Sequence, residues 1–177
     1  SAGRRLAADL TAAGIAPGDR VAVQMGNTSL YVDLLAAAAV GRFVLMAVNQ
    51  RFADRLAESL ITRSGARLVI RSGDDLPAGA NGESEPGCPL PTDRYAIFTT
   101  SGTTSEPKLV VHQQRSVAAH AADVAAGFGY SPESVVMVPV PLCGVFGFTM
   151  LFAAFAGNAR VLLPMTSEPT VLARLIE

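Results

Sequence analysis

The chain has 177 residues, of which 50% are hydrophobic and 16% are charged, so it is long enough to bury one sizeable core. Its formal net charge of −1 creates no basic field, which argues against a general nucleic-acid binder or a membrane-surface protein. Cys88 and Cys143 lie far apart, with no CxxC pair and no histidine cluster beside them. This cysteine usage argues against a zinc site and favours a reducing, cytoplasmic location.

Helices alternate with short apolar strands in the first part of the chain. Apolar residues at helical spacing predict a first helix that ends at Gly14, and Gly26-Asn27-Thr28-Ser29 supplies capping residues for a second. The predicted helices cover residues 4–13, the stretch from the capping residues to Val40, and 54–63, and the strands cover 20–25, 43–48 and 67–71. Such alternation, with near-continuous apolar strands, predicts an α/β fold whose strands are largely parallel.

Residues 72–91 are rich in Gly, Pro, Ser and acidic side chains, which predicts a flexible surface loop or internal linker. Helices and strands resume after this loop. The predicted strands cover 95–99, 109–111, 135–140 and 160–163, and the helices cover 113–128, 146–155 and a last segment that begins near Glu168. The uncharged run 134–159 is long enough to span a membrane, but two prolines and two glycines interrupt it. We therefore expect no continuous spanning helix.

The segment between the strands at 95–99 and 109–111 has the composition of a phosphate-binding loop. Gly102 lets the main chain approach a ligand closely, and Lys108 supplies a positive charge. Five hydroxyl groups can donate hydrogen bonds, from Thr100, Ser101, Thr103, Thr104 and Ser105. On composition alone a solvated turn is an equally good interpretation. The spacing does not fit a Walker A loop, because Lys108 follows a proline and precedes a leucine.

The same segment resembles the signature T-S-G-T-T-G-x-P-K-G of the acyl-adenylate-forming superfamily, which contains acyl-CoA synthetases, peptide-synthetase adenylation domains and luciferases. Residues 100–104 and 107–108 match it position for position, whereas Ser105 and Leu109 replace two glycines and would stiffen the loop. Three other stretches agree in order and spacing, namely Gly18–Val23 with Asn27, Val48-Asn49 with Arg51, and Ser64–Arg67. The resemblance implies that residues 1–177 form part of a large N-terminal adenylation domain, with the C-terminal part absent.

By this resemblance, the carboxylate of a substrate attacks the α-phosphorus of ATP, pyrophosphate leaves, and the thiol of CoA or of a carrier pantetheine takes the acyl group. Lys108 would be the catalytic residue, and Thr104 would contact Mg²⁺. The phosphates would be bound by Thr100, Ser101, Gly102, Thr103, Thr104, Ser105 and Lys108. His112 falls where the family often has a histidine, but a structural hydrogen bond is the better interpretation of this residue.

The stretch Pro139–Gly147 resembles the P-L-x-H-x-x-G element that lines the acyl pocket of the family. The resemblance makes Gly144, Val145 and Phe146 candidate pocket residues, and Gly144 replaces the aromatic or histidine gate of the family. The implied partners are a small carboxylic acid and either CoA or an acyl or peptidyl carrier protein, without nucleic acid.

The adenine-binding and ribose-binding residues of the family, and its C-terminal catalytic lysine, would lie beyond Glu177. We therefore expect these 177 residues alone to be inactive. We also expect Phe148, Phe152 and Phe155 to pack against strands of the missing part. Two other classes stay open: a non-catalytic binding module that keeps the fold, and a different nucleotide-dependent transferase.

Overall fold

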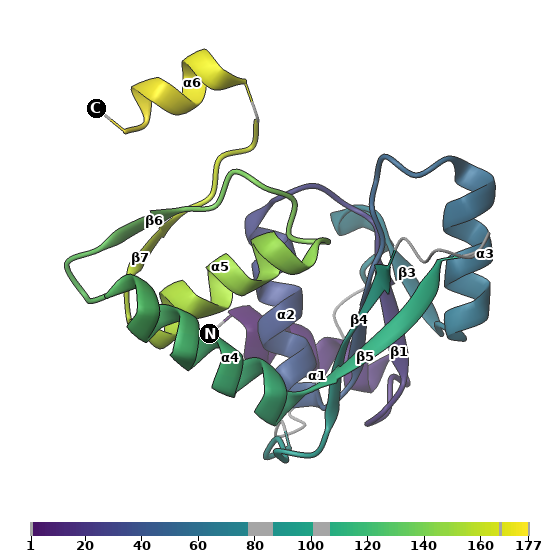
Figure 1. The fold of residues 1–177 in the computed structure, drawn as a ribbon. Coiled ribbons are helices and arrows are strands. Elements are labelled where there is room, and N and C mark those ends of the chain that lie inside the picture. The colour runs from purple at the N-terminus through teal and green to yellow at the C-terminus, as the bar shows by residue number, and fades with distance from the viewer. Residues whose placement is uncertain (1, 78–86, 101–106, 167, 177) are drawn as a thin grey trace. The chain divides into compact units, whose positions relative to one another are not determined.

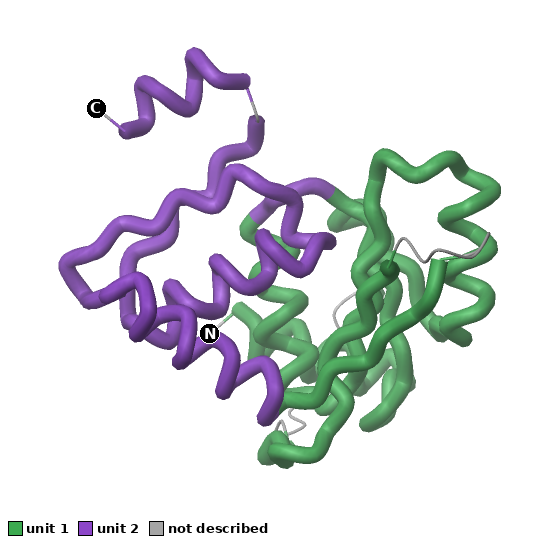
Figure 2. Tube along the Cα trace, in the orientation of Figure 1, with its two compact units in different colours: residues 1–25, 29–114 green, residues 26–28, 115–177 purple. Residues whose placement is uncertain are grey.

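The computed structural model describes residues 2–77, 87–100, 107–166 and 168–176. The chain divides into two compact units, which Figure 2 distinguishes by colour. The first unit contains residues 1–25 and 29–114, and the second contains residues 26–28 and 115–177. A three-residue segment between two elements of the first unit therefore belongs to the second.

A five-stranded sheet forms the centre of the first unit, in the order β3-β1-β2-β4-β5. Its strands are β1 (Arg20–Val23), β2 (Val44–Ala47), β3 (Leu68–Ile70), β4 (Arg94–Thr100) and β5 (Lys108–Gln113). β1 pairs in parallel with β2 and β3, and β2 pairs in parallel with β4. Only β5 runs antiparallel, because the short connection after β4 allows a hairpin but no crossover. The prediction of an α/β fold with largely parallel strands is confirmed.

Helices cover both faces of this sheet (Figure 1). They are α1 (Ala2–Ala12), α2 (Ser29–Gly41) and α3 (Asp54–Ser64). Ala57, Leu60 and Ile61 of α3 pack on apolar residues of β1, β2 and β4 in one buried cluster. α1 and α2 pack against each other on the opposite face, where a Cβ atom on Gly3 would lie only 2.6 Å from the Ala36 side chain. Gly65 ends α3 in a left-handed conformation, which glycine adopts without strain.

The second unit contains α4 (Gln114–Phe128, of which Gln114 belongs to the first unit), β6 (Val135–Met137), α5 (Val145–Ala156), β7 (Arg160–Leu162) and α6 (Pro169–Arg174). β6 and β7 pair in parallel, and α5 connects them and contacts both strands. β6 ends three residues before its predicted end, because Pro139 lacks the N–H group that a paired strand requires. No helix in the described part of the chain is both long and apolar enough to cross a membrane.

The structure bears on the predicted loop 72–91 and on the expected packing of the phenylalanines of α5. The predicted loop 72–91 begins with a 3₁₀ turn, η1 (Gly73–Asp75), that Ser72 caps, and its residues 78–86 lie outside the described part. The interpretation of the phenylalanines of α5 is wrong for Phe148, because its side chain is only 5% exposed within this chain. Phe148 stacks on Phe152 at a centroid distance of 4.4 Å, whereas Phe155 is 47% exposed.

Candidate active site

The two ends of the predicted phosphate loop are the last residues of β4 and the first of β5. Thr99 pairs with Leu109 and Thr100 pairs with Lys108, so the antiparallel ladder continues to the point where the loop begins. Thr100 and Lys108 are both exposed. Ser101, Gly102, Thr103, Thr104 and Ser105 lie outside the described residues. The structure therefore brings together Thr100 and Lys108 of the predicted phosphate-binding set.

Side chains outside the hairpin ladder support the start of β5. Leu109 packs against the buried cluster beneath the sheet, and Arg63 of α3 donates a hydrogen bond from Nη1 to the Pro107 carbonyl oxygen at 3.2 Å. Farther along the strand, His112 meets the ring of Phe98 edge to face, with centroids 5.6 Å apart. His112 therefore has a packing role inside the hairpin, and the structural hydrogen bond expected for this residue stays a prediction. Sequence reasoning missed Arg63, because its contact joins residues 44 positions apart.

This hairpin end has the chemical character of an anion site. Lys108, a cation, and Thr100, which carries a hydroxyl group, are exposed partners across the ladder. A cation beside a hydroxyl donor suits a phosphate oxygen, which accepts hydrogen bonds and carries negative charge.

Among the described residues, no group of three His, Cys, Asp or Glu side chains could hold a metal ion. Cys88 is exposed and Cys143 is half-buried.

The candidate pocket residues lie at the start of α5 in the second unit. Gly144 is the N-cap residue of this helix, and its N–H group donates to the Pro141 carbonyl oxygen at 3.0 Å. Val145 and Phe146 occupy the first turn and are 50% and 84% exposed. A Cβ atom on Gly144 would lie 3.5 Å from the Pro141 oxygen, an ordinary contact distance. The backbone at position 144 therefore has room for a side chain.

The turn before α5 is held by a residue that sequence reasoning placed elsewhere. The Asn27 side chain donates from Nδ2 to the carbonyl oxygens of Val140 at 2.9 Å and Val138 at 3.4 Å. Its Oδ1 atom accepts a hydrogen bond from the Leu142 N–H group at 2.8 Å. Asn27 was expected among the capping residues of the second helix. No local sequence signal predicts these bonds, because they join residues more than 110 positions apart.

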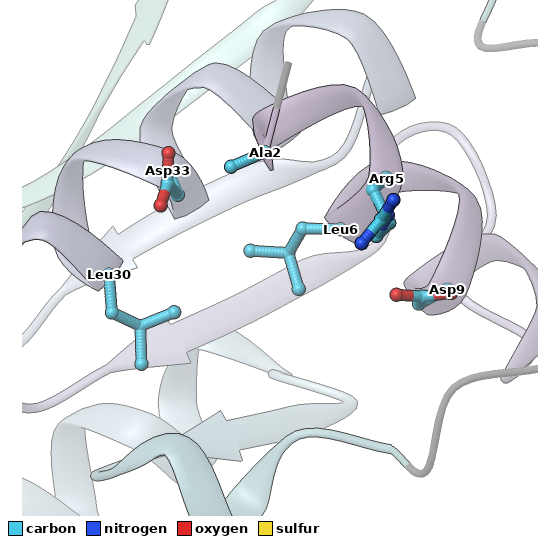
Figure 3. A pocket seen from close by; sticks show the side chains of 6 residues that line it. All are labelled: Ala2, Arg5, Leu6, Asp9, Leu30 and Asp33. Carbon is cyan, nitrogen blue, oxygen red and sulfur yellow. The ribbon is translucent and has the colours of Figure 1, made fainter.

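Two open pockets in the first unit contain none of the predicted site residues. The pocket in Figure 3 has a volume of about 550 Å³ and is lined by residues of α1 and α2, namely Ala2, Arg5, Leu6, Asp9, Leu30 and Asp33. The other has a volume of about 540 Å³ and lies at the carboxyl ends of β1, β2 and β3, beside Gln24, Gln50, Asp54, Ala57, Glu58 and Arg71. Both linings contain acidic and basic side chains, so neither pocket has an electrostatic potential of a single sign that would favour an anion or a cation.

A family model described as "AMP-binding enzyme" matches residues 2–177. Among curated proteins, the long-chain-fatty-acid–CoA ligase FadD13 of Mycobacterium tuberculosis is 28% identical over 202 aligned positions, which cover 98% of this chain and 40% of that protein. The fatty acid–[acyl-carrier-protein] ligase ScoC of Streptomyces coeruleorubidus is 33% identical over 137 positions, which cover 63% of this chain and 26% of that protein.

Solved structures with the same fold agree with this match. The inhibitor-bound N-terminal domain of FACL13 from Mycobacterium tuberculosis superposes with a TM-score of 0.88 at 27% identity, covering 99% of this chain and 51% of that one. The o-succinylbenzoate CoA synthetase of Bacillus subtilis, solved with ATP and magnesium, gives a TM-score of 0.85 at 21% identity, covering 99% and 52%, a likeness in fold alone. The chain thus spans about a quarter of the length of ScoC and about two fifths to one half of the length of the other three.

Proposed function

Because the chain belongs to the family of AMP-binding enzymes, we propose that the protein containing it activates a carboxylic acid as an acyl-adenylate with ATP and then transfers the acyl group to a thiol. One observation carries this proposal: Thr100 and Lys108, the first and the last but one residue of the family-like signature, pair across a hairpin and are both exposed. A phosphate chain needs a cation and hydroxyl donors that converge on it, and this hairpin end provides one of each.

In the proposed reaction, the first unit holds the phosphates of ATP. The Lys108 ammonium group and the Thr100 hydroxyl bind the phosphates that leave as pyrophosphate, together with the hydroxyls of Ser101, Thr103, Thr104 and Ser105 and the main chain at Gly102. The Lys108 charge stabilises the charge that develops on the leaving group while the substrate carboxylate attacks the α-phosphorus. Mg²⁺, when bound with the nucleotide, supplies further charge neutralisation, and Thr104 is its proposed contact.

The proposed acid pocket is bounded on one side by Gly144, Val145 and Phe146. The two exposed apolar side chains suit an acid with an apolar body, and the absence of a side chain at Gly144 leaves space beside them. The FadD13 and ScoC relatives are ligases of CoA and of an acyl carrier protein, so either thiol is a candidate acceptor. A cytoplasmic location without a nucleic-acid partner belongs to the same proposal and is supported by the cysteine usage and the net charge of −1.

Acid-dependent exchange of labelled pyrophosphate into ATP tests this function in the full-length protein. Lys108→Ala is expected to reduce exchange by roughly 10²–10³-fold, the usual effect of removing one group that stabilises a transition-state charge. Arg94→Ala is the matched control, because Arg94 is an exposed cation at the opposite end of the same hairpin. Exchange that survives Lys108→Ala unchanged would overturn the assignment of Lys108.

The same assay separates the proposed enzyme from a non-catalytic module that keeps the fold. Leu109 favours the second candidate, because its packing against the core fixes a position where the family has a glycine. A full-length protein that binds ATP, but exchanges no pyrophosphate with any acid in a panel of chain lengths, would contradict the proposed activity and support the binding module.

A further inference from the structure

We propose that Asn27 is a positioning residue for the acid pocket: its side-chain amide fixes the turn 138–142 and thereby places the first turn of α5. The proposal rests on the proposed function, because its candidate pocket residues are Gly144 at the N-cap of α5 and Val145 and Phe146 in the first turn. Asn27 and the turn both belong to the second unit. The inference therefore needs only contacts inside that unit.

The strand pairing of β6 ends where the turn begins. β6 ends at Met137, and the Val138 N–H group makes one further bond to the Leu162 carbonyl oxygen at 2.9 Å. Pro139 and Pro141 follow and have no N–H group to donate. Carbonyl oxygens in such a stretch need donors from elsewhere, since an unsatisfied carbonyl is costly when it is removed from water. The Asn27 amide supplies these donors.

The three bonds of Asn27 use both halves of its amide. The Nδ2 group donates to Val140 and Val138, and Oδ1 accepts from Leu142, so one planar group bridges three alternate residues of the turn. A neutral amide is the side-chain group that both donates twice and accepts. Asp at this position would keep the acceptor, lose the donors and place a negative charge beside two carbonyl oxygens. The site is therefore specific for an amide and not merely for a polar residue.

The turn is coupled to α5 through close backbone contacts. Gly144 donates its N–H to the Pro141 oxygen at 3.0 Å, which joins the turn to the N-cap of the helix. Gly147, the third residue of α5, is buried, and a Cβ atom there would lie 2.4 Å from the Pro141 oxygen and 2.8 Å from the Val140 oxygen. Val140 and Pro141 therefore lie directly against the helix backbone. A shift of the turn must move the start of α5.

Steady-state kinetics of the full-length protein with Asn27→Ala and Asn27→Asp tests the proposal. Both variants are expected to raise the KM for the acid about tenfold, the effect of losing one or two hydrogen bonds that hold a binding group in place, and to change the KM for ATP less than about twofold. Hydrogen exchange at residues 138–147 is expected to speed up in both. Ser131→Ala is the control, since the Ser131 hydroxyl bonds locally to Glu133 at 2.6 Å in the same unit.

Each outcome decides between a positioning role and another explanation. An unchanged KM for the acid despite faster exchange at 138–147 would overturn the proposal. Equal rises in both KM values, or a change matched by Ser131→Ala, would show a general structural role and also overturn it. If Asn27→Ala does not fold, the isosteric Asn27→Asp carries the test. A wild-type protein without acid-dependent pyrophosphate exchange would instead refute the proposed function, and the exchange rate at Leu142 would still report whether Asn27 holds the turn.

Discussion

The hairpin of β4 and β5 and the turn before α5 carry the two candidate parts of the site, and they are held in different ways. The hairpin has a backbone ladder from Arg94–Gln113 to Thr100–Lys108, with a packed leucine and an arginine contact in addition. The turn depends on one amide side chain and on one glycine that fits against its backbone. Many small interactions together stabilise the hairpin, whereas a few contacts fix the geometry of the turn. Single substitutions should therefore affect the turn more than the hairpin.

Gly147→Ala should have the largest effect, because it acts on the turn. The added methyl group would lie 2.4 Å from the Pro141 oxygen, and the atoms in the way are backbone atoms that cannot rotate aside. We expect a loss of about 3 kcal/mol in the free energy of unfolding, at the upper end of overpacking substitutions. Denaturant unfolding of the full-length protein measures it. Gly144→Ala is the control, because its methyl group would lie at an ordinary 3.5 Å, and an equal loss there would contradict the explanation.

Leu109→Gly tests the hairpin in the same way and should cost less. It removes a half-buried side chain from the core and adds the backbone freedom of glycine, together about 2 kcal/mol of stability. The control is Val111→Gly two residues along β5, where the side chain is 48% exposed and the backbone effect is the same. If the two variants lose equal stability in denaturant unfolding, the packing of Leu109 contributes nothing.

The sequence predicted the hairpin better than the turn, and the comparison explains why. β4 and β5 are encoded by apolar runs on the two sides of one polar loop, so the sequence predicted strands at 95–99 and 109–111. It assigned Thr100 and Lys108 to the loop, whereas both lie in the strands and pair with each other. The turn is fixed by Asn27, more than 110 positions away, and local rules assigned that residue to a helix cap instead. The prediction for Phe148 was wrong for a related reason. Its burial depends on packing within the second unit, which no local sequence pattern reveals.

Tyr95→Phe removes a single bond beneath the hairpin and should have a smaller effect. The Tyr95 hydroxyl donates to the Leu35 carbonyl oxygen of α2 at 2.9 Å, and its side chain is only 1% exposed. Burial raises the pKa of this hydroxyl well above its ordinary value, so it stays protonated and remains a donor. We expect a loss of about 1 kcal/mol in denaturant unfolding, the usual net value of one hydrogen bond. A loss as large as that of Gly147→Ala would contradict the view that interactions around the hairpin are individually weak.

The smallest effect should come from the ion pair at the base of β4, and it should depend on pH. Arg42 donates from Nε and Nη2 to the Asp93 carboxylate at 2.8 and 3.0 Å, while the Asp93 carbonyl oxygen accepts from the Gln114 N–H group at the open end of the hairpin. The hydrogen bond from Arg42 holds the pKa of the Asp93 carboxyl below its ordinary value. A folded-state pKa below the unfolded value of about 3.9 means that Asp93 contributes its stabilisation above that pH and loses it as the pH falls through the folded value.

Asp93→Asn should therefore lower the denaturation midpoint slightly at pH 7, and the difference from wild type should shrink as acid protonates Asp93. Arg42→Ala supplies the control, because without the guanidinium the effect of Asp93→Asn should lose most of this pH dependence. The Arg42 backbone has a positive φ of 58°, so the double-mutant cycle must use the same substitution in both arms to cancel any change in backbone strain. If the Asp93→Asn effect keeps its full size after acid has protonated Asp93, the ion pair does not produce it.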